Sequence, residues 1–171
     1  IFGVVERLLT KVWKELLGID LAERYPSGFP KMTFAESMRR FGNDKPDLRF
    51  GMEHTDLTEL VIAQGGGGVP LLAEIAERFA KGEDRRDLPQ HIVKCMVVPA
   101  DGGPAKKPLS RKDLDELESF VKQMRSPGLA RAKVGEDMSW SQTAWKSATP
   151  EFVRAVNEAC GAKPGDIIVF Q

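Results

Sequence analysis

The sequence predicts an α+β fold, in which an antiparallel or mixed sheet carries two or three helices packed on one face. Apolar side chains recur at helical spacing over residues 2–17 and 149–161, which is typical of helices that bury one side. Short runs rich in β-branched or alternating apolar residues occupy 91–99, 129–134 and 165–170, which is typical of strands. No internal repeat is visible, and this order of elements favours a single layer of helices on a sheet.

Composition and charge limit the function classes. The chain has 171 residues, of which 42% are hydrophobic and 29% charged, as in an ordinary globular protein. Acids and bases balance at 25 each, so the average charge indicates neither a nucleic-acid nor a membrane partner. No apolar run approaches membrane-spanning length. Cys95 and Cys160 are too few for a disulfide scaffold and favour a reducing, cytoplasmic location.

The first predicted elements are helical. The helix over residues 2–17 should end at Gly18, and a Pro/Gly loop follows over 25–30. Thr33 and Glu36 have the spacing of a capping box for a short helix. The chain begins inside an apolar helix pattern and ends inside an apolar strand pattern. We therefore expect it to be a piece of a larger protein.

The stretch "FGNDKPDLRFGME", residues 41–53, has the densest local charge pattern of the chain. Two acids, Asp44 and Asp47, alternate with Lys45 and Arg49 around a proline. The pattern indicates either a salt-bridged turn or a site where the planar guanidinium of Arg49 meets an anion. Residue types alone leave both interpretations open.

The middle of the chain holds a run of four glycines, residues 65–68. Asp56 can cap a short helical turn before the run, and Pro70 can start a helix over residues 71–81 after it. A phosphate-binding loop would require a strand before the glycines and a Lys-Ser/Thr pair after them, and neither is evident. The run is therefore interpreted as a hinge or linker.

The second half of the chain predicts a compact succession of strands and helices. A long basic turn, residues 100–108, follows the first strand. Ser110 and Asp113 then form a capping box for a helix that carries an apolar face. Thr149 caps the last helix, which has Pro150 at its first position.

A search for reactive groups gives no catalytic and no metal-binding candidate. His54 and His91 lack partners at ligand spacing, so each is interpreted as a surface or half-buried histidine. The two cysteines have no neighbouring histidine and favour core packing over nucleophilic chemistry. Trp140 could stack on a nucleotide base, but packing over the sheet is the favoured interpretation, as it is for Trp145.

Local charge supplies the binding candidates. Residues 105–133 contain eight Lys or Arg against four Asp or Glu, although the acids share a helix with some of the bases. These bases could contact phosphates or form an ordinary solvated surface. With the two bases of the 41–53 stretch, the candidate anion or tRNA-phosphate contacts are Lys45, Arg49, Lys106, Lys107, Arg111, Lys112, Arg131 and Lys133.

Residues 29–53 closely resemble a segment of bacterial-type aspartyl-tRNA synthetases, a class II family. The matching run is Phe-Pro-x-Met-Thr-x-x-Glu-x-Met, followed by Gly-x-Asp-Lys-Pro-Asp-Leu-Arg. The preceding helix resembles the one that leads to this run. "VVPADGGPAKKPLSRKDLDELESFVKQMRSPGLARAKV" and "GDIIVF" resemble the domain inserted into these enzymes, the GAD domain. Residues 64–91 depart from the family pattern, so the first strand of this domain is expected to be displaced or lost.

The resemblance implies a division at residue 60. Residues 1–60 would be a mainly helical piece of the synthetase catalytic domain, and 61–171 the inserted GAD-type α+β domain. The parent enzyme would attach aspartate to tRNA with ATP and Mg, as a cytoplasmic homodimer. The arginines that bind ATP in this family would lie outside residues 1–171. The fragment itself should therefore need no cofactor and have no catalytic residue, and its partners would be tRNA and the rest of the catalytic domain.

Two rival functions stay open at this point. The chain could be a structural or protein-interaction module that braces the catalytic domain or the dimer without touching RNA. It could also be the related domain of a glutamyl-tRNA(Gln) amidotransferase subunit. The resemblance of residues 29–53 to the synthetase catalytic domain argues against the amidotransferase.

Overall fold

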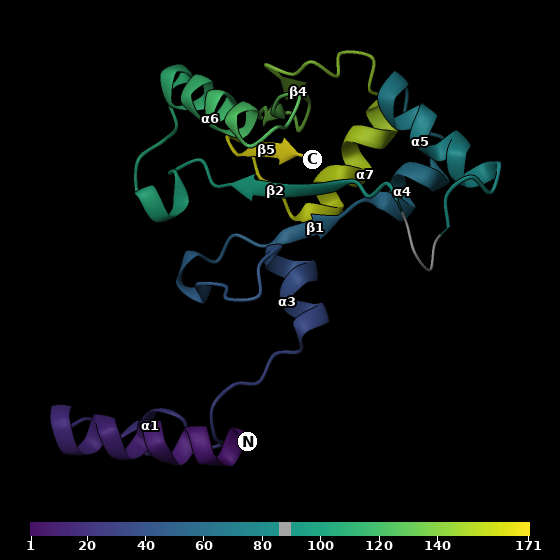
Figure 1. Ribbon diagram of the computed structural model, residues 1–171. Helices are drawn as coiled ribbons and strands as arrows, with labels where there is room; N and C mark the ends of the chain where they lie inside the picture. Colours follow the sequence, from purple (N-terminus) through teal and green to yellow (C-terminus); the bar gives the residue numbers. More distant parts are fainter. Residues whose placement is uncertain (86–89) are drawn as a thin grey trace. The chain divides into compact units, whose positions relative to one another are not determined.

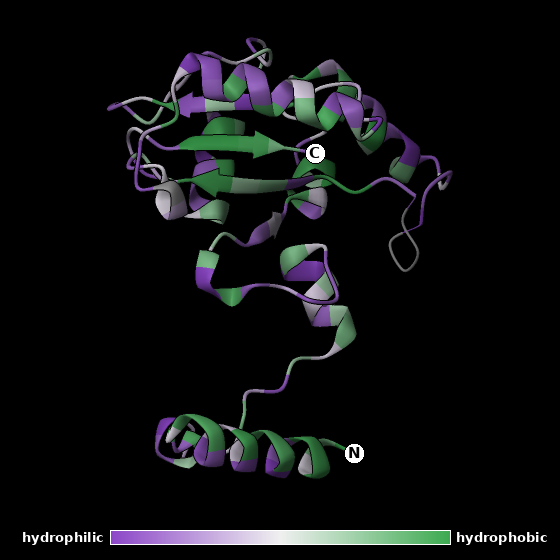
Figure 2. Cartoon of the chain, turned by 60° about the vertical axis from the view of Figure 1, so that its left-hand side comes forward, coloured by the Kyte–Doolittle hydropathy of each residue, from purple (hydrophilic) through white to green (hydrophobic). Residues whose placement is uncertain are grey.

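The chain folds into two units, residues 1–36 and 37–171, in a computed structural model that describes residues 1–85 and 90–171 (Figure 1). The first unit contains α1 (Phe2–Leu17) and α2 (Leu21–Arg24), and α3 (Phe34–Phe41) begins at its end. As predicted, α1 ends at Gly18, which adopts the left-handed conformation with φ of 66°. No residue of α1 is buried, and Figure 2 shows hydrophobic colour along most of the helix.

The second unit is built on a five-stranded sheet in which all described pairs are antiparallel. The strand order is β1-β2-β5-β3-β4. The strands are β1 (His54–Asp56), β2 (Lys94–Val98), β3 (Ala130–Val134), β4 (Trp140–Ser141) and β5 (Ile167–Phe170). The α+β prediction is confirmed, as are three of its strands. The sequence did not predict β1 or β4, which have only three and two residues.

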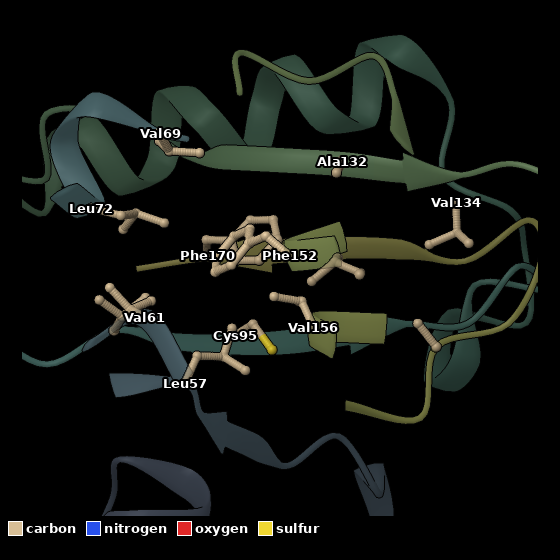
Figure 3. Packing of buried hydrophobic residues seen from close by; sticks show 13 residues of the cluster. Leu57, Val61, Val69, Leu72, Cys95, Ala132, Val134, Phe152, Val156 and Phe170 are labelled. Atoms are coloured by element: carbon tan, nitrogen blue, oxygen red, sulfur yellow. The ribbon is translucent and has the colours of Figure 1, made fainter. Parts of the chain in front are cut away.

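Three helices cover one face of this sheet: α4 (Thr58–Ala63), α5 (Pro70–Ala80) and α7 (Pro150–Cys160). The predicted layer of helices on one face is therefore present, but the helix predicted after Ser110 does not belong to it. The buried side chains of the three helices meet those of the strands in one cluster, which includes Phe152 and Val156 of α7 together with Cys95 and Phe170 of the sheet (Figure 3). Phe152 is fully buried, which stabilises the fold by about 1.5–3 kcal/mol relative to an exposed ring.

A fourth helix, α6 (Arg111–Gln123), belongs to the opposite face of the sheet. Ala132 faces the buried cluster, so its neighbour Arg131 points to the other side of β3. There Arg131 forms ion pairs with Asp115 and Glu118 of α6. Only Leu114 of α6 is buried, so this helix is held by charges as well as by apolar contact.

The four glycines are not a flexible linker, and this prediction is wrong. They form a tight turn between α4 and α5, and all four have positive φ. A Cβ at Gly66 would lie 2.1 Å from the backbone nitrogen of Ala73, and one at Gly67 would lie 2.1 Å from the ring of Phe152. At Gly66 and Gly67 the neighbouring backbone and ring leave no room for a side chain, which explains why these two positions are glycine.

The glycine turn does not form a phosphate cradle either. The amides of Gly65, Gly66 and Gly67 donate to carbonyl oxygens of residues 61–64, and the carbonyl of Gly67 accepts from the amide of Thr149 at 2.9 Å. The element before the turn is the helix α4, and the nearest preceding strand is β1. The short strand β1, which pairs with β2, lies upstream of the glycines, and the expected displacement or loss of the inserted domain's first strand stays a prediction.

Trp140 and Trp145 pack over the sheet, as predicted. The ring centroids of Trp145 and Phe170 are 4.3 Å apart, and those of Trp140 and Phe170 are 5.4 Å apart. The indole Nε1 of Trp140 donates to Oδ1 of Asn157 at 2.8 Å. These contacts fix both rings within the fold.

The two compact units do not correspond to the predicted division at residue 60, which separates a piece of the catalytic domain from an inserted domain. Contacts within the chain separate residues 1–36 from 37–171. The boundary between a catalytic-domain piece and an inserted domain stays a prediction.

Among the described helices, none combines the length and the apolar character needed to cross a membrane.

Candidate functional site

The basic turn, residues 100–108, leaves the end of β2 and folds back on itself. Gly102 has a φ of 83°, and a Cβ there would lie 1.8 Å from the carbonyl oxygen of Lys107. Lys106 adopts the left-handed conformation with φ of 49°, and its amide donates to the carbonyl of Gly103 at 2.9 Å. Consecutive exposed lysines, Lys106 and Lys107, therefore project from a closed loop of backbone.

A buried carboxylate anchors the start of this turn. Asp166 is 8% exposed, and its Oδ1 accepts from the amide of Ala100 at 2.9 Å. Its Oδ2 accepts from the amide of Lys163 at 2.9 Å. The hydrogen bonds join the turn to the loop before β5 and so fix the position from which the lysines project.

The helix after the turn begins with the predicted capping box. The amide of Asp113 donates to Oγ of Ser110 at 3.2 Å, and the amide of Ser110 donates to Oδ2 of Asp113 at 2.7 Å. The hydroxyl of Ser110 also donates to Oδ2 of Asp113 at 2.6 Å. This bond and the one from the Ser110 amide lower the pKa of Asp113, and the charges of Lys107 and Lys112 lower it further. Arg111 occupies the first helical position, next to the turn.

The carboxylates of α6 neutralise several of the candidate bases. Lys112 pairs with Glu116 at 3.7 Å, and the two nitrogens of the Arg131 guanidinium reach Asp115 at 3.4 Å and Glu118 at 3.3 Å. Glu118 also accepts from Lys122 at 2.7 Å, which lowers its pKa. The acids of this helix thus face bases of the same helix and of β3.

The remaining bases of the region stay unpaired. Within residues 1–85 and 90–171, no carboxylate forms an ion pair with Lys106, Lys107 or Arg111. Lys133 has no ion pair there either, and it shares a row across the sheet with Ile167 and Val98, the last residue of β2. Lys133 therefore lies at the end of the sheet from which the basic turn departs.

The stretch over residues 41–53 forms a turn closed by its own charges. The guanidinium of Arg49 donates to both carboxylate oxygens of Asp47 at 2.5–3.1 Å, and these bonds lower the pKa of Asp47 to about 2. Arg40 and Glu53 form a second pair, which the sequence did not reveal because the residues are 13 positions apart. The structure therefore contains the salt-bridged turn that the sequence offered as one interpretation.

Lys45 and Arg49 do not join the basic turn through any hydrogen bond or ion pair of the described residues. The side chain of Lys45 is exposed, and its amide donates to Oδ1 of Asn43 at 2.9 Å. Arg49 is 87% exposed but already engaged by Asp47. The eight candidates therefore fall into three groups. Lys45 and Arg49 lie in the turn around residue 47, and Lys106, Lys107 and Arg111 form the unpaired cluster. The third group lies on α6 and β3 and consists of the paired Lys112 and Arg131 and of Lys133.

The histidines and cysteines lie outside this cluster. His91 is half-buried, and its Nδ1 lies 2.7 Å from Oδ2 of Asp84, while Nδ1 of His54 is buried without a partner among the described residues. Cys95 is in the core, as predicted, and its pKa is raised by a hydrogen bond with the thiol of Cys160 and by burial. The described residues contain no group of His, Cys, Asp and Glu able to hold a metal ion.

Comparison with known proteins gives one family match and a consistent set of relatives. Residues 89–171 match the model of the GAD domain. The chain is 49% identical over 172 residues to an aspartate–tRNA(Asp/Asn) ligase of Anaeromyxobacter dehalogenans, an alignment that covers all of this chain and 25% of the relative. It is 38% identical to an aspartate–tRNA ligase of Staphylococcus carnosus, over 96% of this chain and 24% of the relative.

The similarity extends to more distant proteins of the same kind. An aspartate–tRNA(Asp/Asn) ligase of Syntrophotalea carbinolica is 32% identical over 99% of this chain. In each case the chain spans about a quarter of the length of the curated relative it matches. The alignment with the Anaeromyxobacter ligase covers the whole chain, including residues 1–88, which precede the GAD match, so both parts of the chain resemble the same protein.

Proposed function

Because residues 89–171 belong to the GAD domain family and the whole chain is similar to a quarter of several aspartate–tRNA ligases, we propose that it is a non-catalytic, tRNA-proximal part of such a ligase. The parent enzyme would join aspartate to tRNA with ATP and Mg. This chain would position the tRNA and would perform no step of the reaction. The free thiols of Cys95 and Cys160 are consistent with a cytoplasmic location.

The single observation that carries the proposal is the unpaired cluster of Lys106, Lys107 and Arg111. A base that is already paired must give up a carboxylate to contact a phosphate, whereas an unpaired base releases only counterions. Most other bases of the region are paired with carboxylates of α6. Lys106 and Lys107 also project from a turn held by Gly102 and Asp166, and Arg111 begins the helix that follows, so a phosphate would meet a rigid surface.

The proposal is tested by titrating tRNA(Asp) with the 171-residue chain at low salt. Reversal of the cluster in Lys106→Glu/Lys107→Glu/Arg111→Glu should weaken binding by at least about a hundredfold, since three phosphate contacts become repulsive. The matched control is Lys11→Glu/Lys81→Glu/Lys163→Glu, which changes the net charge equally at exposed lysines elsewhere. Equal weakening in the two triple variants would show that only net charge matters and would contradict the proposal.

A second function rests on a different observation. The apolar side chains of α1 are exposed, including Phe2, Leu8 and Leu16 at 69%, 60% and 76%. A helix with such a face is typical of a protein-protein contact, so the chain could brace the catalytic domain or the dimer. Under this function tRNA affinity would be absent at low salt, which separates it from the first.

A further inference from the structure

A cavity of about 530 Å³ lies at the connection between β4 and α7, away from the basic turn. It is lined by residues 137–143, by Trp145, Lys146 and Ala148, and by the first two turns of α7. None of its lining residues belongs to the cluster of Lys106, Lys107 and Arg111. Its volume is within the range of pockets that hold small organic ligands, which is about 300–1,000 Å³.

Two unpaired cations line this cavity. Lys146 and Arg154 are exposed, and no carboxylate of the described residues forms an ion pair with either. Among the lining residues Asp137 supplies a carboxylate, but its Oδ1 already accepts from Oγ of Ser139 at 2.7 Å and from the amide of Ser139 at 3.1 Å. The lining thus carries a net positive charge with two free donors, as an anion would require.

The aromatic side of the cavity is held in place by contacts within the protein. Trp140 donates to Asn157, and Nδ2 of Asn157 donates in turn to the carbonyl of Met138 at 2.8 Å. Asn157 is 2% exposed, so this link is inside the protein. Trp145 packs against Phe170. The two indoles therefore present a preformed surface that pays little ordering entropy when a flat group binds.

The backbone around the cavity is strained. Met138 and Gln142 have φ of 63° and 51°, and they are two of the four described non-glycine residues with positive φ. Both line the cavity. Such conformations cost energy for residues with a side chain, and they concentrate at sites where a particular backbone path is required.

We propose that this cavity binds one nucleotide of a single-stranded RNA segment. Lys146 and Arg154 contact its phosphate, and the surface of Trp140 and Trp145 contacts its base. A cation pair beside an aromatic surface is the combination that single-stranded nucleic acids require, because backbone charge and base stacking are recognised together. The inference rests on the proposed function, since it names the part of the RNA that a second site on the same chain would hold.

The test uses the full chain in a Trp13→Phe background, so that fluorescence reports only on Trp140 and Trp145. A single-stranded RNA tetramer of adenylate, titrated at low salt, should change the fluorescence saturably. Lys146→Gln/Arg154→Gln should raise the Kd at least about tenfold, because two charge-assisted contacts are lost. It should also reduce the slope of log Kd against log salt by about 1.4, as expected for two contacts to a single strand.

The control is Lys163→Gln, which removes an exposed unpaired cation outside the cavity and should leave tetramer binding unchanged. No saturable change with the tetramer, or equal affinity in the double variant and the control, would overturn the inference. Inorganic phosphate or AMP that binds as tightly as the tetramer would overturn the assignment to an RNA strand. Tetramer binding without tRNA(Asp) binding would refute the proposed function alone, and the reverse result would refute the cavity site alone.

Discussion

At the scale of single residues, Asp84 shows how one buried carboxylate holds nearby backbone amides. Its side chain is 1% exposed. It accepts hydrogen bonds from the amides of Arg85, Gln90 and His91 at 2.7–2.9 Å and contacts the imidazole of His91. Burial alone would raise the pKa of this carboxyl, but the hydrogen bonds outweigh it and lower the pKa to about 2.

This lowered pKa predicts a specific acid sensitivity. The carboxyl titrates near 4 in the unfolded chain, so its contribution to stability is fully present above that pH. It is lost as the pH falls through about 2, the pKa in the folded protein. Asp84→Asn should therefore lower the unfolding temperature at pH 7, and the difference from the native chain should shrink between pH 4 and pH 2.

Thermal unfolding followed by circular dichroism across that pH range checks the prediction. Asp101→Asn is a suitable control, because Asp101 is exposed and accepts a single amide hydrogen bond, from Gly103. A constant difference between native chain and Asp84→Asn at every pH would contradict the assigned pKa.

At the scale of elements, the glycine turn between α4 and α5 makes a sharp stability prediction. Gly67→Ala combines a left-handed backbone with a clash against the ring of Phe152, so it should cost about 2–5 kcal/mol of unfolding free energy. Gly65→Ala has a similar φ of 55° but no atom within 4 Å, so it should cost only about 1–2 kcal/mol.

Urea unfolding measures the loss of unfolding free energy in Gly67→Ala and in Gly65→Ala. The difference between them isolates the packing against Phe152 from the backbone penalty that they share. Equal losses in the two variants would mean that the turn is not packed against α7, and would restore the interpretation of a flexible linker.

Elements defined by local patterns could be predicted from the sequence. The end of α1 at Gly18 and the capping box of Ser110 and Asp113 depend on residues at most four positions apart. The strand β1 could not be predicted, because three residues are too short for a period and become a strand only by pairing with β2. The glycine turn was misinterpreted because its tight neighbour, Phe152, lies 85 positions further along the chain.

Contacts between residues far apart in the sequence also limited the prediction of the candidate sites. Composition grouped eight bases over residues 105–133, but the partners that neutralise Arg131 lie 13 and 16 positions away on α6. Arg154 escaped notice because it sits on the exposed side of α7, where a cation is usually a solvated surface residue. Arg154 lines the same cavity as Lys146 only because of the fold of the loop before α7, whereas Trp140 could be recognised from the sequence as a candidate for base stacking.

At the scale of the whole molecule, we expect a chain that binds RNA without catalysis. The isolated chain should show neither aminoacylation of tRNA(Asp) nor exchange of pyrophosphate into ATP in the presence of aspartate and Mg. The resemblance to aspartyl-tRNA synthetases implies that the arginines that bind ATP lie outside residues 1–171. A full-length relative serves as the positive control. Robust activity of the chain in either assay would contradict the assignment of catalysis to other parts of the enzyme.

The most direct test of the central claim is the salt dependence of tRNA(Asp) binding by this chain. If the unpaired cluster of Lys106, Lys107 and Arg111 contacts phosphates, log Kd should rise steeply with log salt, and neutralising the cluster with glutamine should reduce the slope by about 2–3. Replacing the paired Lys11, Lys81 and Lys122 by glutamine should leave the slope unchanged. An identical slope in the native chain and the cluster variant would contradict the claim that this turn meets the RNA.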